Sequence, residues 1–215
     1  MDGQNLAFTS NPRRHLETNA LVCYGNKGAA QKADINRLNG NTLPVTQEFP
    51  ADVEFDFVRN RGGYIDVTML GVVGAYRASG RRGRPILGNY IPYLGQQNRN
   101  PSKDNFGRIN LSRVTTNYVF TFSFTGCNFV VTREGGDAYV YHQPLSEAVT
   151  RANPFNGITI INAGIGPDYT QADVVGGYGC LVRDIAVAGR WIVYIQTPIG
   201  VKMTAARLTA TTINI

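Results

Sequence analysis

The chain has 215 residues and a formal net charge of +6, yet only 17% of its residues are charged and 24 are glycine. This length fits one domain with a sizeable core, and the composition favours a sheet-rich globule. No stretch of about 18 apolar residues occurs, so the sequence predicts no membrane span. No phosphate-binding loop, dinucleotide-binding, zinc-protease or nucleophile-elbow motif is present, which argues against those chemistries.

The first part of the chain is polar and weakly periodic. We expect residues 1–50 to form a loosely packed lead-in to a core over residues 51–215, all within one domain spanning 1–215. Asp34–Leu38 is the one helical turn expected there, and His15, beside two arginines, is expected to be solvated and without a role. The N-terminus lacks the basic and apolar regions of a classical signal peptide, so export would need another route or a carrier polypeptide.

Strand patterns begin after this lead-in. Val53–Val58 alternates apolar and acidic residues, which predicts a strand with one wet face, and Tyr64–Tyr76 is a second β-rich run. Near the end of the chain the sequence predicts a short helix over Pro144–Ala152 and strands over Gly157–Ala163, Cys180–Ala188, Trp191–Gln196 and Val201–Ile215. We therefore expect an α+β, mostly β fold, a mixed β-sandwich with few short flanking helices and long surface loops.

Residues 77–108 stand out by charge, with seven basic residues and one acidic residue. Glycine, proline and asparagine are interleaved, which predicts a long surface loop, and such loops are usually functional or disordered. We expect Arg81, Arg82 and Arg84 to hold a macromolecular target near the rim of the site described next. Nucleic acid ranks second as a partner, and an anionic membrane surface or a solvated loop with no partner also stays open.

The candidate site lies between Tyr118 and His142. Aromatic residues at every second position from Tyr118 to Phe124 predict a half-buried strand, which Thr125-Gly126 ends. Cys127–Arg133 and Ala138–His142 are two further β-rich runs around a glycine-rich turn, so they predict a hairpin.

The register of this hairpin brings a thiol and an imidazole together. A turn centred on Glu134 and Gly135 puts Cys127 directly opposite His142, with Cβ atoms about 4.5–5.5 Å apart. A turn centred on Gly135-Gly136 makes the two residues diagonal neighbours on the same face. Either arrangement suits nucleophilic cysteine chemistry, in which a base takes the thiol proton. A buried core cysteine and a half-exposed histidine are the structural alternative.

The Thr125-Gly126-Cys127 turn, with Thr121 six residues before the cysteine and His142 fifteen residues after it, resembles the cysteine glutamine deamidases. That superfamily includes the catalytic domain of the cytotoxic necrotizing factors, the Burkholderia-type lethal factor and the bacterial chemoreceptor deamidases. The resemblance covers about 25 of the 215 residues. Position 125 is threonine where the toxins carry serine.

This resemblance implies a toxin-like protein glutamine deamidase with a mixed β-sandwich fold. Cys127 would be the nucleophile, His142 the acid and base, and Thr121 the residue that orients His142. Backbone N–H groups around Thr125 and Gly126 would hold the oxyanion. No metal or cofactor is implied. The implied partner is a target protein with a reactive glutamine, such as a Rho-family GTPase or a translation factor, reached by a secreted bacterial effector in the host cytosol.

Two other function classes stay open. A transglutaminase or cysteine peptidase could use the same pair, since only the acyl acceptor differs, and a non-catalytic β-sandwich binding module would keep both residues in its core. The three cysteines lie far apart without a C-x-x-C motif, which argues against a disulfide framework and a zinc site. A single Cys23–Cys180 bond stays open.

Overall fold

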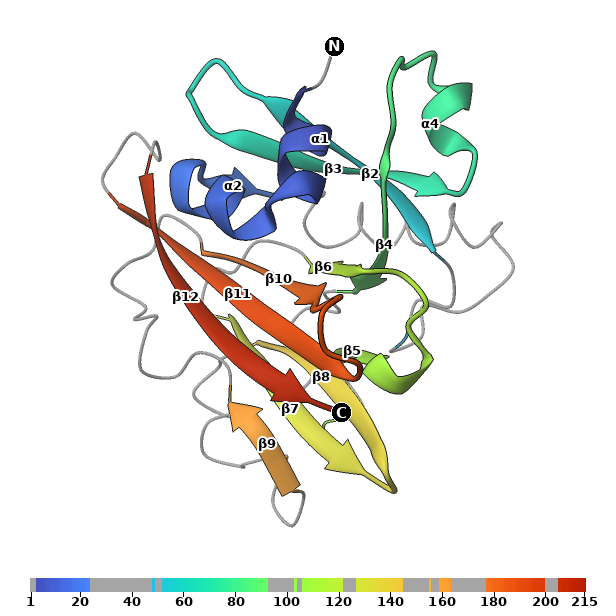
Figure 1. Cartoon of the computed structure of the whole chain (residues 1–215), viewed down its shortest axis with the longest axis vertical. Helices are drawn as coiled ribbons and strands as arrows, with labels where there is room; N and C mark the ends of the chain where they lie inside the picture. Colours follow the sequence, from blue (N-terminus) through green and yellow to red (C-terminus); the bar gives the residue numbers. More distant parts are fainter. Residues whose placement is uncertain are drawn as a thin grey trace.

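The computed structural model describes residues 3–23, 48, 52–92, 103, 106–121, 127–144, 155, 159–163, 177–199 and 205–215. Within these residues the protein is mostly β, with two sheets and few short helices (Figure 1), which confirms the predicted fold class. The helices expected over Asp34–Leu38 and after Pro144 fall outside the described residues.

The larger sheet has eight strands in the order β1-β3-β2-β4-β6-β10-β11-β12 among the described residues. They are β1 (Leu21–Val22), β2 (Val53–Arg59), β3 (Ile65–Val72), β4 (Ile86–Ile91), β6 (Tyr118–Thr121), β10 (Tyr178–Arg183), β11 (Arg190–Ile199) and β12 (Ala205–Asn214). The β1–β3 and β4–β6 pairs are parallel and the other pairs are antiparallel, so the sheet is mixed.

The smaller sheet has the order β5-β8-β7-β9 and is antiparallel throughout. Its strands are β5 (Gly107–Asn110), β7 (Cys127–Glu134), β8 (Asp137–Pro144) and β9 (Thr159–Ala163). The described helices are α1 (Gly3–Ser10), α2 (Pro12–Thr18), α4 (Ala75–Ala78) and the 3-10 helix η2 (Leu111–Arg113).

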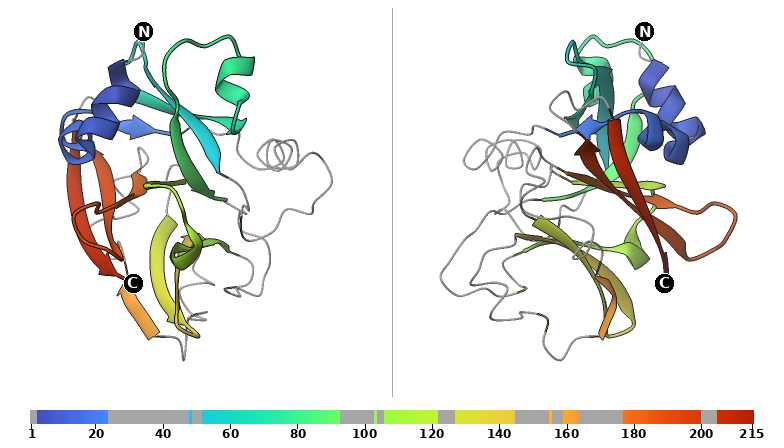
Figure 2. Two further views of the ribbon diagram at one scale, coloured as in Figure 1. Left: turned by 45° about the vertical axis from the view of Figure 1, so that its right-hand side comes forward. Right: turned by 90° about the vertical axis from the view of Figure 1, so that its left-hand side faces the viewer.

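The larger sheet separates two apolar cores, because consecutive side chains of a strand point to opposite faces. Phe120 and Cys180 face a core that also holds Phe8 of α1 and Leu16 of α2. Their neighbours on the same strands, with Trp191 and Val193 of β11, face a second core shared with β7 and β8 of the smaller sheet. Figure 2 shows the smaller sheet beside the β11–β12 hairpin. The protein therefore has three layers, in the order helices, larger sheet and smaller sheet.

Residues 3–23, the described start of the N-terminal segment, are packed more tightly than the lead-in that we expected. Asn11 caps α2 by accepting a hydrogen bond from Arg14 N at 3.0 Å, and Pro12 follows it at the first helical position. The side chains of Phe8 and Leu16 are fully buried. His15 is also buried, at 4% exposed, and is not solvated as predicted. These short helices are stabilised because their apolar side chains pack against the sheet. The polar composition of the segment gave no sign of this packing.

A buried glutamine ties this segment to the larger sheet. Gln196 of β11 donates from Nε2 to the backbone oxygens of Leu16 at 2.5 Å and Asn19 at 2.6 Å. Its Oε1 accepts a hydrogen bond from Leu21 N at 2.9 Å. One side chain thus satisfies the end of α2 and the start of β1 at once.

The acidic face of β2 is covered, although the sequence predicts a wet one. Glu54 and Asp56 are only 7% and 1% exposed. Glu54 Oε2 accepts a hydrogen bond from Tyr76 N at 2.6 Å, while Asp56 accepts one from Asn5 Nδ2 at 2.9 Å and forms an ion pair with Arg81. Buried carboxylates are tolerated when they are paired in this way.

The segment over residues 77–108 is not one long loop. It contains β4, a central strand of the larger sheet, and the first residues of β5. Gly88 and Asn89 lower the β propensity of β4 and hid it from the sequence prediction. A Cβ on Gly88 would lie 3.0 Å from the Phe120 ring and from Tyr118 O, a tight contact that favours glycine at this position.

The junction between β4 and β5 gives a test of this packing. A Cβ on Gly107 would lie 1.6 Å from Pro92 O, so Gly107→Ala must push the two strands apart. We expect the free energy of unfolding, measured by urea denaturation, to fall by about 3 kcal/mol. Gly3→Ala is the matched control, since its Cβ would meet nothing within 4 Å. A loss of less than about 1 kcal/mol in Gly107→Ala would contradict the close approach.

Candidate active site

A hydrogen bond across the two sheets organises the candidate site. Thr121 ends β6 in the larger sheet and His142 lies in β8 of the smaller sheet, and Thr121 Oγ1 is 2.6 Å from His142 Nδ1. Both residues are buried, at 0% and 1% exposed. The contact expected between them is therefore present. It is possible because β6 belongs to the larger sheet, whereas β7 and β8 belong to the smaller sheet.

The second partner of Thr121 fixes the tautomer of the histidine. Thr121 Oγ1 donates to Ile91 O at 2.9 Å. A hydroxyl has one proton to donate, so Thr121 must accept the hydrogen bond from an N–H at Nδ1 of His142. The neutral ring then carries its lone pair at Nε2, the nitrogen available to accept a proton.

Pairing between strands positions Ile91, Thr121 and His142, the three residues joined by these hydrogen bonds. The parallel pairing of β4 and β6 sets Ile91 beside Thr121. His142 pairs with Gly107 of β5 on one side and with Phe129 of β7 on the other. The Phe129 ring packs edge-on against the imidazole, with ring centroids 6.4 Å apart and an interplanar angle of 76°. Hydrogen bonding and packing together define the orientation of the ring.

The β7–β8 hairpin determines where Cys127 lies relative to His142. Glu134 pairs with Asp137, and the two turn residues between them, Gly135 and Gly136, have φ angles of +59° and +93°. Two consecutive positive φ angles are typical of the type I′ turn and favour glycine. The turn is therefore centred on Gly135-Gly136, and the prediction of a turn centred on Glu134 and Gly135 is wrong.

This register decides how the two candidate catalytic residues meet. Cys127 pairs with Pro144, while Phe129 pairs with His142. Cys127 and His142 are therefore not directly opposed but diagonal neighbours on the same face, as the second predicted register has it. That face contributes Cys127 and Phe129 to the core between the sheets.

The site is shielded from solvent. Cys127 is 4% exposed, and burial lowers the pKa of His142 to about 3. His142 is therefore neutral at neutral pH, and the same burial opposes the imidazolium that proton transfer to the ring would create. The same burial also fits a core role for both residues.

Thr125 and Gly126, the predicted oxyanion turn, lie outside the described residues. The predicted target-binding arginines lie between α4 and β4 in the chain. Arg82 and Arg84 are exposed, whereas Arg81 forms an ion pair with the buried Asp56. Arg81 therefore has a structural partner that sequence reasoning missed.

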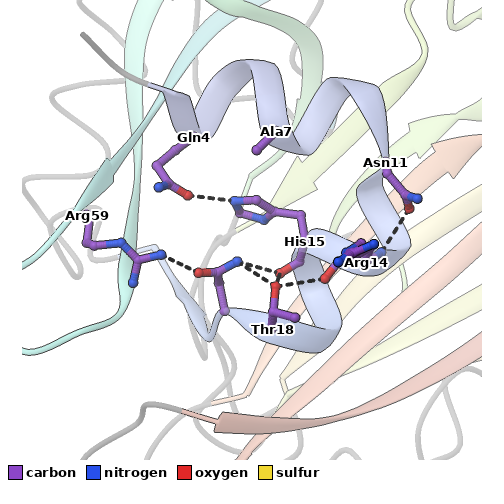
Figure 3. Close-up of a pocket in the computed structure, with 8 residues that line it drawn as sticks. Gln4, Ala7, Asn11, Arg14, His15, Thr18 and Arg59 are labelled. Atoms are coloured by element: carbon purple, nitrogen blue, oxygen red, sulfur yellow. Dashed lines mark hydrogen bonds between the residues drawn. The ribbon is translucent and has the colours of Figure 1, made fainter.

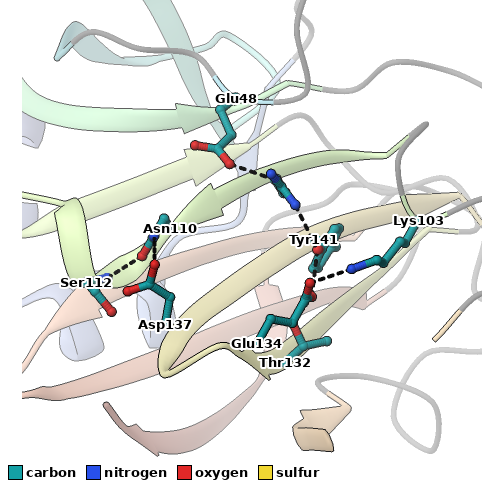
Figure 4. Close-up of polar contacts among 9 residues, drawn as sticks. Glu48, Lys103, Asn110, Ser112, Thr132, Glu134, Asp137 and Tyr141 are labelled. Atoms are coloured by element: carbon teal, nitrogen blue, oxygen red, sulfur yellow. Dashed lines mark hydrogen bonds and ion pairs between the residues drawn. The ribbon is translucent and has the colours of Figure 1, made fainter. Parts of the chain in front are cut away.

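A polar network surrounds Glu134 of β7 and Tyr141 of β8 in the smaller sheet (Figure 4). Tyr141 donates to Glu134 Oε1 at 2.8 Å, and Lys103 Nζ lies 2.5 Å from Glu134 Oε2. Arg108 donates to Tyr141 at 3.3 Å and to Glu48 Oε1 at 2.7 Å. Burial raises the pKa of Tyr141 to about 12, so this hydroxyl keeps its proton at neutral pH. Two basic residues of the 77–108 segment are thus engaged within the protein.

No metal centre or membrane-spanning helix is found in the part of the chain that the structure describes. No group of three or more His, Cys, Asp or Glu lies there that could hold a metal ion. None of the described helices is long and apolar enough to cross a bilayer. All three cysteines are among the described residues and none forms a disulfide, so the Cys23–Cys180 bond is not made. Comparison of the sequence with protein-family models and with curated proteins finds no match.

The two buried histidines predict a loss of stability in acid. Burial lowers the pKa of His15 to about 4 and that of His142 to about 3, from an ordinary value of 6.5. Below pH 6.5 the unfolded chain binds protons that the folded protein does not, so stability falls as the pH falls. Each histidine should contribute about 2 kcal/mol of loss between about pH 7.5 and 5, measured by urea unfolding.

His15→Gln and His142→Gln serve as paired controls for this effect. Each variant should lose the pH dependence of one histidine, and the double variant should lose both. Single variants with the full pH dependence of the parent protein would show that other groups cause it.

Proposed function

We propose that the protein is a protein glutamine deamidase with Cys127 as its nucleophile. One observation carries the proposal. Thr121 gives its own proton to Ile91 O and accepts the Nδ1–H of His142, so Nε2 is left as a proton acceptor. The face of the hairpin that holds His142 also holds Cys127. The resemblance to the cysteine glutamine deamidases supports the same assignment.

In the first half-reaction the sulfur of Cys127 attacks the carboxamide carbon of a glutamine side chain. The thiol proton passes to Nε2 of His142, and a tetrahedral intermediate forms. As that intermediate collapses, its C–N bond breaks and the proton held by His142 leaves with the nitrogen as ammonia. The product is a thioester between Cys127 and the target protein.

In the second half-reaction water attacks the thioester carbon and gives a proton to His142. The C–S bond then breaks, Cys127 regains its proton, and the target keeps a glutamate side chain. Thr121 is a positioning residue in both halves, because it holds the ring with Nε2 available. Backbone N–H groups of Thr125 and Gly126 are proposed to stabilise the oxyanion.

The proposed partner is a protein and not free glutamine. By resemblance it is a Rho-type GTPase or a translation factor, reached by a secreted bacterial effector in the host cytosol. Binding energy from a protein surface can be used to position the reacting amide, which a free amino acid cannot supply. No cofactor takes part in the proposed steps.

Two alternative functions stay open, one that uses the same catalytic pair and one without catalysis. A transglutaminase or cysteine peptidase would form the same acyl-enzyme and differ in the acyl acceptor or the bond attacked. A non-catalytic β-sandwich module is favoured by one observation, the 4% exposure of Cys127 within the core between the sheets.

The central test is intact-mass analysis of a purified Rho-type GTPase and a translation factor after incubation with the protein. Deamidation should raise the target mass by about one dalton at a single glutamine. Cys127→Ser should abolish the change, and Thr121→Val should slow it by roughly 10- to 100-fold by releasing the imidazole. Thr121→Ser keeps the hydroxyl and should retain most of the activity.

Controls separate the alternatives. Cleavage of the target would indicate a peptidase, and incorporation of an added amine would indicate a transglutaminase. Iodoacetamide near neutral pH should alkylate Cys127 faster than Cys23 or Cys180. Equal and slow alkylation of the three thiols, with no change in either target, would support the non-catalytic module.

A second test concerns the exposed arginines after α4. Replacing Arg82 and Arg84 by alanine should slow reaction with the protein target several-fold at low salt, mainly through the association rate. Arg81 is left in place because its loss would strand the buried charge of Asp56. Alkylation of Cys127 should not change.

The matched control is Arg61→Ala with Arg113→Ala, which removes the same charge from exposed positions on other elements. It should react nearly as fast as the parent protein. If both double variants are slowed equally, the loss of net charge explains the effect, and Arg82 and Arg84 have no specific role in target binding.

A further inference from the structure

A polar pocket of about 470 Å³ lies where α1 and α2 meet the end of β2 (Figure 3). Gln4, Arg14, His15 and Asn19 line it from the helical segment, and Arg59 lines it from β2. Figure 3 shows the two arginines on either side of His15. The pocket is formed by other elements than those that carry Thr121, Cys127 and His142, so the inference below does not rest on the proposed function.

The pocket gathers positive charge without a carboxylate in its lining. Five cations elsewhere in the described part of the chain pair with carboxylates: Arg13 with Glu17, Arg81 with Asp56, Lys103 with Glu134, Arg108 with Glu48 and Arg190 with Asp184. Among the described residues Arg14 and Arg59 have no such partner. Their charge is therefore uncompensated within the described fold.

Two hydrogen bonds within the protein hold the guanidinium of Arg59 in place. It donates from Nη2 to Asn19 Oδ1 at 2.5 Å and from Nη1 to Gly63 O at 3.1 Å. Asn19 is in turn fixed by its own donation to His15 O at 2.9 Å. Since a guanidinium carries five N–H donors, others are left to bind a ligand, and little side-chain entropy is lost on binding.

His15 forms part of the pocket wall. His15 Nε2 lies 3.0 Å from Gln4 Oε1, while Nδ1 is buried without a hydrogen-bond partner. Burial, and then the charge of Arg59, lower the pKa of His15 to about 4. The charge of Arg59 opposes a further positive charge at His15, and an anion is the electrostatic complement of the two arginines that line the pocket.

We propose that this pocket binds the phosphoryl group of a small phosphorylated compound between Arg14 and Arg59. A phosphoryl group carries up to two negative charges and three acceptor oxygens, which matches two guanidinium groups better than a single carboxylate does. The pocket volume falls in the range of small-molecule sites. A soluble phosphate ester and a phosphorylated lipid headgroup present the same chemistry.

The test is an NMR titration of the full chain with inorganic pyrophosphate at constant ionic strength. We expect a saturable shift of the His15 ring signals and a rise in the His15 pKa of about one unit, because a bound anion favours the imidazolium. A shift that follows ionic strength without saturating would overturn the proposal.

Arginine variants make the test specific. Arg14→Gln and Arg59→Gln should each weaken pyrophosphate binding about tenfold. Arg13→Gln removes the same charge one residue away, from a side chain that pairs with Glu17, and should bind within about twofold of the parent protein. If Arg59→Gln does not fold, Arg14→Gln alone decides. Equal weakening by Arg13→Gln and Arg14→Gln would overturn the site.

The source of the phosphoryl group is separated by two further probes. Binding of a soluble inositol phosphate without sedimentation on vesicles would support a soluble ligand. Sedimentation with vesicles that contain a phosphatidylinositol phosphate, lost in Arg14→Gln, would support a lipid headgroup. Binding of neither probe, together with no response to pyrophosphate, would overturn the proposal.

Discussion

The hydrogen bond between Thr121 and His142 is the interaction on which the arrangement of the two sheets depends. It lies beside an otherwise apolar core, and each of its members would cost about 1–3 kcal/mol if left without a partner. Ile91, Thr121 and His142 come from three strands and two sheets, so the bond forms only when all three strands are in register. Many combinations of apolar side chains could fill the core between the sheets, but the hydrogen bonds among Ile91, Thr121 and His142 form in only one arrangement of the strands.

The same principle holds the N-terminal helices to the larger sheet. Gln196, Asn5 and Asp56 are buried, and each joins segments that are far apart in the sequence. Apolar contacts supply most of the driving force for this packing, while the polar contacts select one docking position. The result is a layered molecule in which the candidate site and the polar pocket lie on different elements, one between the sheets and one where α1 and α2 meet the end of β2.

Sequence reasoning found the features that depend on local pattern. It gave the strand over Val53–Val58, the hairpin that carries His142 and the mostly β fold, because alternation and turn residues mark them directly. It missed β4, where glycine allows close packing against Phe120 and asparagine accepts a hydrogen bond from Thr116. It also missed the burial of His15 and the partner of Arg81, because both depend on contacts across about 25 or more residues of sequence that no local pattern encodes.

The two-glycine turn between β7 and β8 has a geometric consequence for the site. Side chains alternate along a strand, so the number of residues in the turn sets which residues of β8 share a face with Cys127. If the turn took up one more residue of this sequence, Gln143 would pair with Phe129 in place of His142, and if it released one, Tyr141 would do so; in both cases the imidazole would point to the opposite face of the sheet. The turn therefore sets the register of the hairpin. Its two glycines determine which side chain of β8 lies on the same face as the thiol of Cys127.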